Sequence, residues 1–220
     1  AGSYAVTASI VGGVSADFSL TNTAAIVPLT VSNPTNTTTS VGGSAIFSVS
    51  ASGGTGTLHY QWKKNGTTNV GTDSAVLNLT NVQLSDAGTY ACTVTDRATT
   101  PQSATSQAAT LTVNRAASRT TLSASASQVL SGSALTLTAT VWAPGGTPSG
   151  SVKFLKDGTN LGTVPLDASG RAIFTLLPTQ LGTHTFQAQY QGSASDSPSI
   201  ALPVAVQVVP ATLTISGSTQ

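Results

Sequence analysis

Side chains that could carry out chemistry are few and scattered in this sequence. It has one cysteine, two histidines and seven acidic residues, and all seven are aspartate. Neither His59 nor His184 has a second His, Cys or carboxylate at the spacing of a metal site. Several aspartates belong to turns, as Asp157 does before Gly158. Catalysis by paired carboxylates or by a Gly-x-Ser-x-Gly nucleophile has no matching pattern. We therefore predict no catalytic residue, no metal, no cofactor and no enzymatic activity.

A seven-residue pattern that occurs three times indicates the domain organisation. Each copy has a glycine that ends a turn and then alternates buried with solvent-facing positions, as a β-strand does. The copies are separated by about the length of one small β-sandwich. They are Gly2–Ala8, Gly88–Val94 and Gly182–Ala188. The repeat predicts an all-β chain built from like domains.

Composition agrees with an extracellular all-β array. Only 7% of the residues are charged and the formal net charge is +1. Eight scattered Lys and Arg residues form no basic patch, so we expect no nucleic acid partner. No apolar run reaches the roughly 18 residues that a membrane helix needs, so we expect no membrane span. The sequence begins inside a strand pattern, which favours an excerpt of a longer secreted or cell-surface protein.

Residues 34–115 contain the most specific motif. Trp62 lies in a predicted third strand, and Tyr90 precedes Cys92 by two residues. This stretch resembles an immunoglobulin domain, with the Trp and the tyrosine corner of that fold. The resemblance implies an antiparallel β-sandwich. Val49 stands where the family has its second cysteine, so no intrachain disulfide can form. We expect Cys92 to be a buried apolar filler against Trp62.

Residues 118–209 form a second complete domain by the same alternation. Inward positions are expected at Leu135, Leu137, Ala139, Val152, Phe154, Phe186, Ala188, Val206 and Val208. This stretch resembles a bacterial Ig-like repeat of large surface and secreted proteins. His184 occupies the place of Tyr90, so we predict a corner residue that hydrogen-bonds the backbone.

The two ends have incomplete strand patterns. The pattern of residues 1–23 predicts the C-terminal hairpin of a partial Ig-like domain. Residues 24–33 are expected to be a linker and the first edge of the next domain. Residues 210–220 are expected to be the first strand of a further domain. One interpretation is head-to-tail strand addition between chains. Its interface would comprise Tyr4, Val6, Phe18, Leu20, Leu213 and Ile215. The other interpretation is an excerpt of one continuous array.

Side chains alternate between the two faces of a strand, so Trp142, which follows the inward-facing Val141, should point outward. It could stack on a sugar, or it could pack under the loop from Pro144 to Pro148. Three functions stay open: a structural and adhesive array of a bacterial surface protein or fibre, accessory modules of a secreted polysaccharide-active enzyme, and a glycan-binding domain. The expected partners are Ig-like domains of the same or neighbouring chains and a glycan or host-surface ligand.

Overall fold

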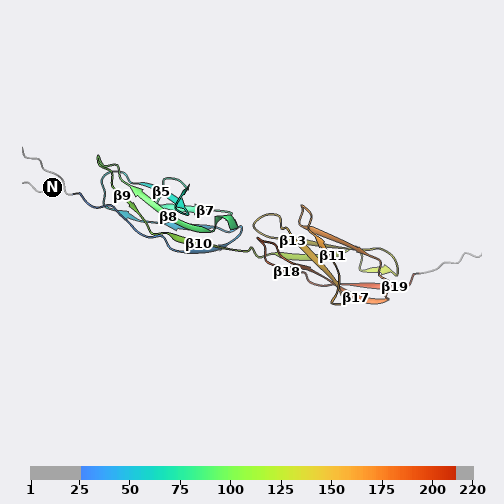
Figure 1. Cartoon of the computed structure of the whole chain (residues 1–220). Coiled ribbons are helices and arrows are strands. Elements are labelled where there is room, and N and C mark those ends of the chain that lie inside the picture. Colours follow the sequence, from blue (N-terminus) through green and yellow to red (C-terminus); the bar gives the residue numbers. More distant parts are fainter. Residues whose placement is uncertain (1–25, 212–220) are drawn as a thin grey trace, which may run out of the picture.

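The computed structural model describes residues 26–211, which form two β-sandwiches placed end to end (Figure 1). All strands predicted for residues 34–209 fall in these two units. The predicted hairpin of residues 1–23, with Tyr4, Val6, Phe18 and Leu20, lies outside the described residues. Leu213 and Ile215 also lie outside them. The strand-addition interface therefore stays a prediction.

The first domain packs a five-strand path against two short strand pairs. The path runs β2 (Thr37–Ser40), β10 (Ala109–Asn114), β8 (Gly88–Thr95), β5 (His59–Lys64) and β6 (Thr68–Val70), and β9 (Ser103–Thr105) adds to β8. Opposite it lie β3 (Ala45–Ser48) with β7 (Val76–Leu79), and β1 (Thr30–Val31) with β4 (Ala51–Ser52). All pairings are antiparallel except β2 with β10.

The second domain repeats this arrangement with longer strands. One sheet is β11 (Arg119–Ala124), β13 (Leu135–Trp142) and β16 (Arg171–Leu176). The other is β12 (Gln128–Leu130), β19 (Val204–Val209), β17 (Gly182–Tyr190), β14 (Ser151–Lys156) and β15 (Thr159–Pro165), with β18 (Ser199–Ile200) beside β17. Here too the pairing of β12 with β19 is parallel. The all-β tandem sandwich predicted from the sequence is confirmed.

Each domain has its own apolar core, because alternate residues of facing sheets point inward. In the first, Trp62 and Cys92 are fully buried and lie opposite each other in β5 and β8. Phe47 stacks on Tyr90 with ring centroids 4.9 Å apart. Val49 belongs to the same cluster. The expected inward residues of the second domain, including Phe154 and Phe186, are likewise buried together.

The only helical turn in residues 26–211 is a 3-10 turn at Leu84–Asp86. No helix in this part of the chain is long and apolar enough to cross a membrane.

Residues 24–33, expected to be a linker and first edge, contain the first strand of the first domain, so this domain begins before residue 34. Leu29 is buried in the first core, and Thr30–Val31 pairs with Ala51–Ser52. The backbone N–H of Ser32 also donates to the Ser50 carbonyl at 2.8 Å. These residues therefore form the first strand of the domain.

Candidate functional surfaces

His59 belongs to a short polar chain on the surface of the first domain. Its Nδ1 lies 2.5 Å from an Asp73 carboxylate oxygen, and Arg97 Nε donates to its Nε2 at 2.7 Å. Hydrogen bonding by the Tyr60 backbone N–H, and then by His59, lowers the pKa of Asp73. A catalytic triad would need a nucleophile at Nε2, where Arg97 is found. The arrangement suits loop fixation.

His184 takes the corner position of the second domain. Tyr90 Oη donates to the carbonyl of Asp86, four residues earlier, at 2.7 Å. His184 Nε2 lies 2.9 Å from the carbonyl of Gln180, also four residues earlier. His184 Nδ1 contacts the Asp157 carboxylate at 2.7 Å. Two different side chains therefore tie the same corner to the backbone. Both ring nitrogens of His184 are occupied in this way.

No three His, Cys or Asp side chains within residues 26–211 gather in a way that could hold a metal ion. Cys92 is fully buried, and burial raises the pKa of its thiol to about 11. A reactive cysteine needs exposure and a lowered pKa. The thiol of Cys92 therefore serves as an apolar group of the core.

Trp142 is the most unusual surface residue of the second domain. Trp142 is 64% exposed, as the alternation of side chains along its strand predicted. The loop containing Pro144 and Pro148 borders the indole on one side but leaves most of it uncovered. The interpretation that Trp142 packs under this loop is therefore wrong. The residue lies directly opposite Arg119 in the pairing of β11 with β13.

The junction between the domains is a second notable surface. Ala116, in the short connection from β10 to β11, is fully buried and forms a parallel bridge with Asp196. Its N–H donates to the Ser195 carbonyl, and its carbonyl accepts from Ser197, both at 2.8 Å. Val41 of the first domain, Ala116 and Ala143 of the second domain form a small buried cluster. The connection is therefore docked on the second domain.

Close backbone approach fixes the same junction from the other side. Gly42 has φ +81° in the turn after β2, and a Cβ there would lie 2.7 Å from the Pro144 carbonyl carbon and oxygen. A Cβ on Gly145 would collide with the Val41 side chain. Only glycine permits this backbone conformation and this contact together. The turn of one domain therefore fits against the loop after β13 of the next.

Sequence reasoning singled out Trp142 but missed the residues around it and the junction. Arg119 becomes its neighbour only through strand register, which the sequence does not state. Gly42 and Gly145 were visible only as turn glycines, because their contact joins two domains. The sequence signal for the junction is Ala116, an apolar residue in a connection that also contains Asn114, Arg115 and Ser118.

Two family models match the chain, one in each domain. Residues 120–209 match the family described as "Bacterial Ig-like domain (group 3)", and residues 28–96 match "Immunoglobulin domain". Both domains are Ig-like. Bacterial Ig-like domains are usually found in surface or secreted proteins. A search of curated proteins finds no match.

Several solved tandem Ig structures are similar to the chain. The amphioxus IgVJ-C2 molecule is 18% identical, with TM-score 0.41, over 78% of this chain and 99% of its own. Titin domains z1z2, solved in complex with telethonin, are 18% identical, with TM-score 0.43, over 82% and 95%. The N-terminal four Ig domains of Dscam1 isoform 6.9 are 16% identical, with TM-score 0.40, over 80% and 43%.

Proposed function

We propose that this Ig-like tandem is a structural and adhesive segment of an extracellular array in a bacterial surface protein or fibre. In this role the domains space and present other parts of the assembly, and their partners are further Ig-like domains. The observation that carries the proposal is the docked junction at Gly42, Ala116 and Pro144. The Ig-like families of both domains support it.

A docked junction suits a spacer because it removes the freedom of the connection. Flexible connections let neighbouring domains move independently. Here the connection is short, because β10 ends at Asn114 and β11 begins at Arg119. It is also fixed, because Ala116 within it is hydrogen-bonded to the second domain. Ser118 Oγ adds a hydrogen bond to the Ser197 carbonyl at 2.6 Å. The two sandwiches are thereby held in one orientation.

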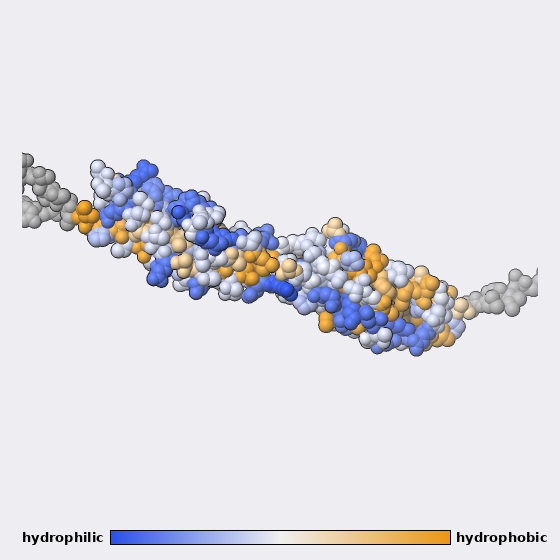
Figure 2. Space-filling model, in the orientation of Figure 1, coloured by the Kyte–Doolittle hydropathy of each residue, from blue (hydrophilic) through white to orange (hydrophobic). Residues whose placement is uncertain are grey.

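The far end of the second domain repeats the turn that forms this junction. Gly132 has φ +82°, and its N–H donates to the Pro178 carbonyl at 2.8 Å. Gly42 has the equivalent bond to the Val82 carbonyl, also at 2.8 Å. Among residues 26–211, no atom lies within 4 Å of a Cβ placed on Gly132. This end also exposes Leu130, Leu177 and Leu181, and hydrophobic colour is visible toward it in Figure 2. It offers the surface on which a further Ig-like domain would dock.

The two turns provide a matched test of the spacer role. We expect Gly42→Val to release the junction and Gly132→Val to leave it intact. Both variants carry the same local strain, about 1–2 kcal/mol for a side chain at positive φ. Residual dipolar couplings of the full chain measure the result. Wild type and Gly132→Val should fit one alignment tensor for both domains, and Gly42→Val should need two. Separate tensors for the wild type would reject a fixed junction and, with it, the spacer role.

We also propose that these domains are not catalytic. The support is positional: the outer nitrogen of each histidine contacts Arg97 or the Gln180 carbonyl, where a nucleophile would be needed. Incubation with a panel of polysaccharide and ester substrates tests this. Turnover that survives purification of the folded chain would contradict it.

A second role is favoured by the exposed Trp142: accessory modules of a secreted polysaccharide-active enzyme. Such modules bind or space a glycan while another domain cleaves it. The full reading frame distinguishes the two roles. A catalytic domain encoded in the same frame supports the accessory role, and further Ig-like repeats support the array.

A further inference from the structure

Five exposed side chains gather on the outer surface of the sheet β11–β13–β16, here named the Trp142 face. They are Arg119, Thr121, Thr140, Trp142 and Arg171. Because β13 is the central strand, Thr140 is paired with Thr121 on one side and with Arg171 on the other, whereas Trp142 is paired with Arg119. The face combines one aromatic ring, two guanidinium groups and two hydroxyl groups, and none of these belongs to the junction described above.

Strand register brings the two arginines to either side of Trp142. Arg119 lies directly opposite Trp142, and Arg171 lies opposite Thr140, two residues earlier in β13. Directly opposed Cβ atoms are about 5 Å apart, and diagonal neighbours are about 7–8 Å apart. Both guanidinium groups can therefore reach a ligand that rests on the indole.

Two shallow hollows flank Trp142. One, of about 380 Å³, is lined by Arg119, Thr121, Thr140 and Trp142. The other, of about 410 Å³, lies between Trp142 and the loop with Pro144 and Pro148. The indole is thus a ridge between two depressions, which suits an extended ligand that crosses the strands.

The charge of the face is positive. β11, β13 and β16 contain no acidic residue. Within residues 26–211 the only side-chain ion pairs with carboxylates involve His59 and His184, so both arginines lack an acidic partner there. The nearest acid in the sequence, Asp167, accepts from the backbone N–H groups of Ser169 and Arg171. These bonds, and to a smaller extent the positive charge of Arg171, lower the pKa of Asp167, and the bonds commit one of its oxygens to the turn.

We propose that the Trp142 face binds an acidic polysaccharide. A sugar ring places its C–H groups on the Trp142 indole, and the acidic group of that sugar or the next accepts from Arg119 or Arg171. Arginine is suited to this because its planar fork matches an oxyanion in a bidentate geometry. Thr121 and Thr140 supply hydroxyl groups that donate to or accept from sugar hydroxyls. The chain has a net charge of only +1, so bulk charge would not attract a polyanion.

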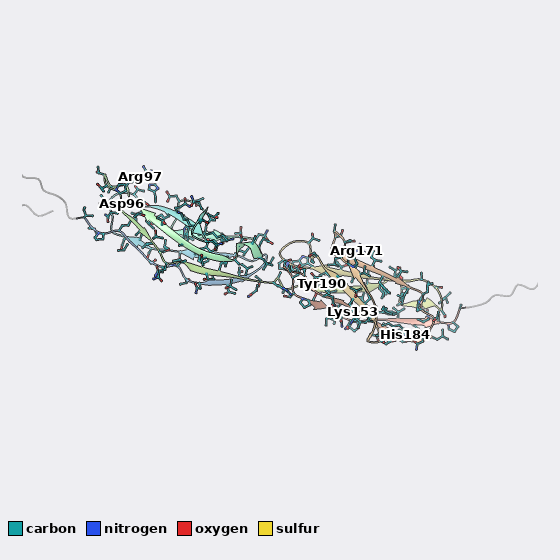
Figure 3. The ribbon with its side chains drawn as sticks, viewed as in Figure 1. Asp96, Arg97, Lys153, Arg171, His184 and Tyr190 are labelled. Carbon is teal, nitrogen blue, oxygen red and sulfur yellow. The ribbon has the colours of Figure 1, made fainter. Side chains whose placement is uncertain are left out.

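This inference gives a ligand class to the adhesive part of the proposed function, and the spacer role does not depend on it. The test is calorimetric titration of the full chain with polygalacturonate at low salt. We expect saturable binding that weakens at least tenfold in Trp142→Ala and in the double variant Arg119→Ala with Arg171→Ala. Lys153→Ala is the matched control, because Lys153 belongs to β14 of the other sheet and Figure 3 shows it apart from Arg171. It should bind within twofold of the wild type.

Two further polymers identify the acidic group and the role of charge. Methyl-esterified polygalacturonate should bind at least tenfold more weakly than the acid form. Dextran sulfate distinguishes a sulfated from a carboxylated sugar, and tight binding of either acidic polymer supports the face. Absence of binding to both acidic polymers would overturn the proposal. Equal loss in Lys153→Ala, or unchanged binding in Trp142→Ala, would also overturn it. Thermal unfolding verifies that each surface variant is folded.

Discussion

The two domains fill the same central space of an Ig-like sandwich in different ways. In the first, Val49 and Cys92 occupy the positions that form the inter-sheet disulfide in immunoglobulins, and Trp62 lies opposite Cys92. In the second, Phe186 stands at the position of Cys92 and Lys156 lies opposite it in β14. At this pair of positions the large aromatic group lies in β5 in the first domain and in β17 in the second.

This difference shows that the fold requires apolar volume at the centre rather than a particular residue. Interiors are packed to the density of organic crystals, so a small residue on one strand requires a large one on a neighbour. The small Cys92 lies in the same core cluster as the large Trp62. The large Phe186 lies in the same core cluster as the small Ala139 and Ala188. Neither domain has a disulfide to supplement its packing.

The largest expected effect comes from removing the central aromatic of either domain. Trp62→Ala and Phe186→Ala should each cost about 3–5 kcal/mol, because each leaves a cavity at the centre of the sandwich. Scanning calorimetry of the full chain should show one lowered transition in each variant, assigned to the altered domain. A cost below about 1 kcal/mol in one domain would show that its centre lies elsewhere.

A polar group at Cys92 should have the next largest effect. Cys92→Ser should cost about 2–4 kcal/mol, since a hydroxyl without a partner replaces a buried thiol. Cys92→Val, which supplies the apolar group found at Val49, should cost less than about 1.5 kcal/mol. Urea unfolding followed by Trp62 fluorescence measures both. Equal costs for the two variants would contradict the apolar-filler role.

The thiol of Cys92 also has a pH signature. Its pKa is raised to about 11 in the folded state, so its contribution to stability is complete below the ordinary thiol pKa and is lost as pH rises toward 11. A thiol reagent at pH 8 should label Cys92 only after urea unfolding. Rapid labelling of the native chain would place the thiol at the surface.

The two corners should prove equivalent despite their different side chains. Tyr90→Phe leaves the Asp86 carbonyl without its side-chain donor, and His184→Phe does the same to the Gln180 carbonyl. Each should cost about 1–3 kcal/mol. Urea unfolding of the two variants tests the comparison. A cost confined to Tyr90→Phe would mean that His184 does not serve as a corner.

The smallest expected effects are changes in stability at low pH. Asp96 of the first domain accepts from the backbone N–H groups of Gln102 and Thr55, which lower its pKa. In the second domain, hydrogen bonding by the Thr185 backbone N–H, and then by His184, lowers the pKa of Asp157. Both stabilise the fold above the ordinary aspartate pKa and lose this effect as pH falls through the lowered value. Asp96→Asn should flatten the acid dependence of the first domain alone, measured as melting temperature between pH 5 and pH 2.

Much of the fold was predictable from local pattern. Alternation over residues 34–209 predicted the strands, and glycine turns predicted their ends. The spacing of Tyr90 and His184 from their preceding glycines predicted two corners. Residues 24–33 were predicted only as a linker and first edge, and the pairing of Thr30–Val31 with β4 places the strand within that stretch. Trp142 was predicted to face outward, but its arginine neighbours were not.

The sequence by itself determined which residues point inward, because a strand alternates its faces whatever its partners are. It also determined that no internal disulfide forms, since Cys92 is the only cysteine. Only the tertiary structure decided that Arg119 and Arg171 flank Trp142, because register depends on how three distant strands align. The contact of Gly42 with Pro144 was likewise decided by the meeting of two separately folded domains, and no local pattern encodes such a meeting.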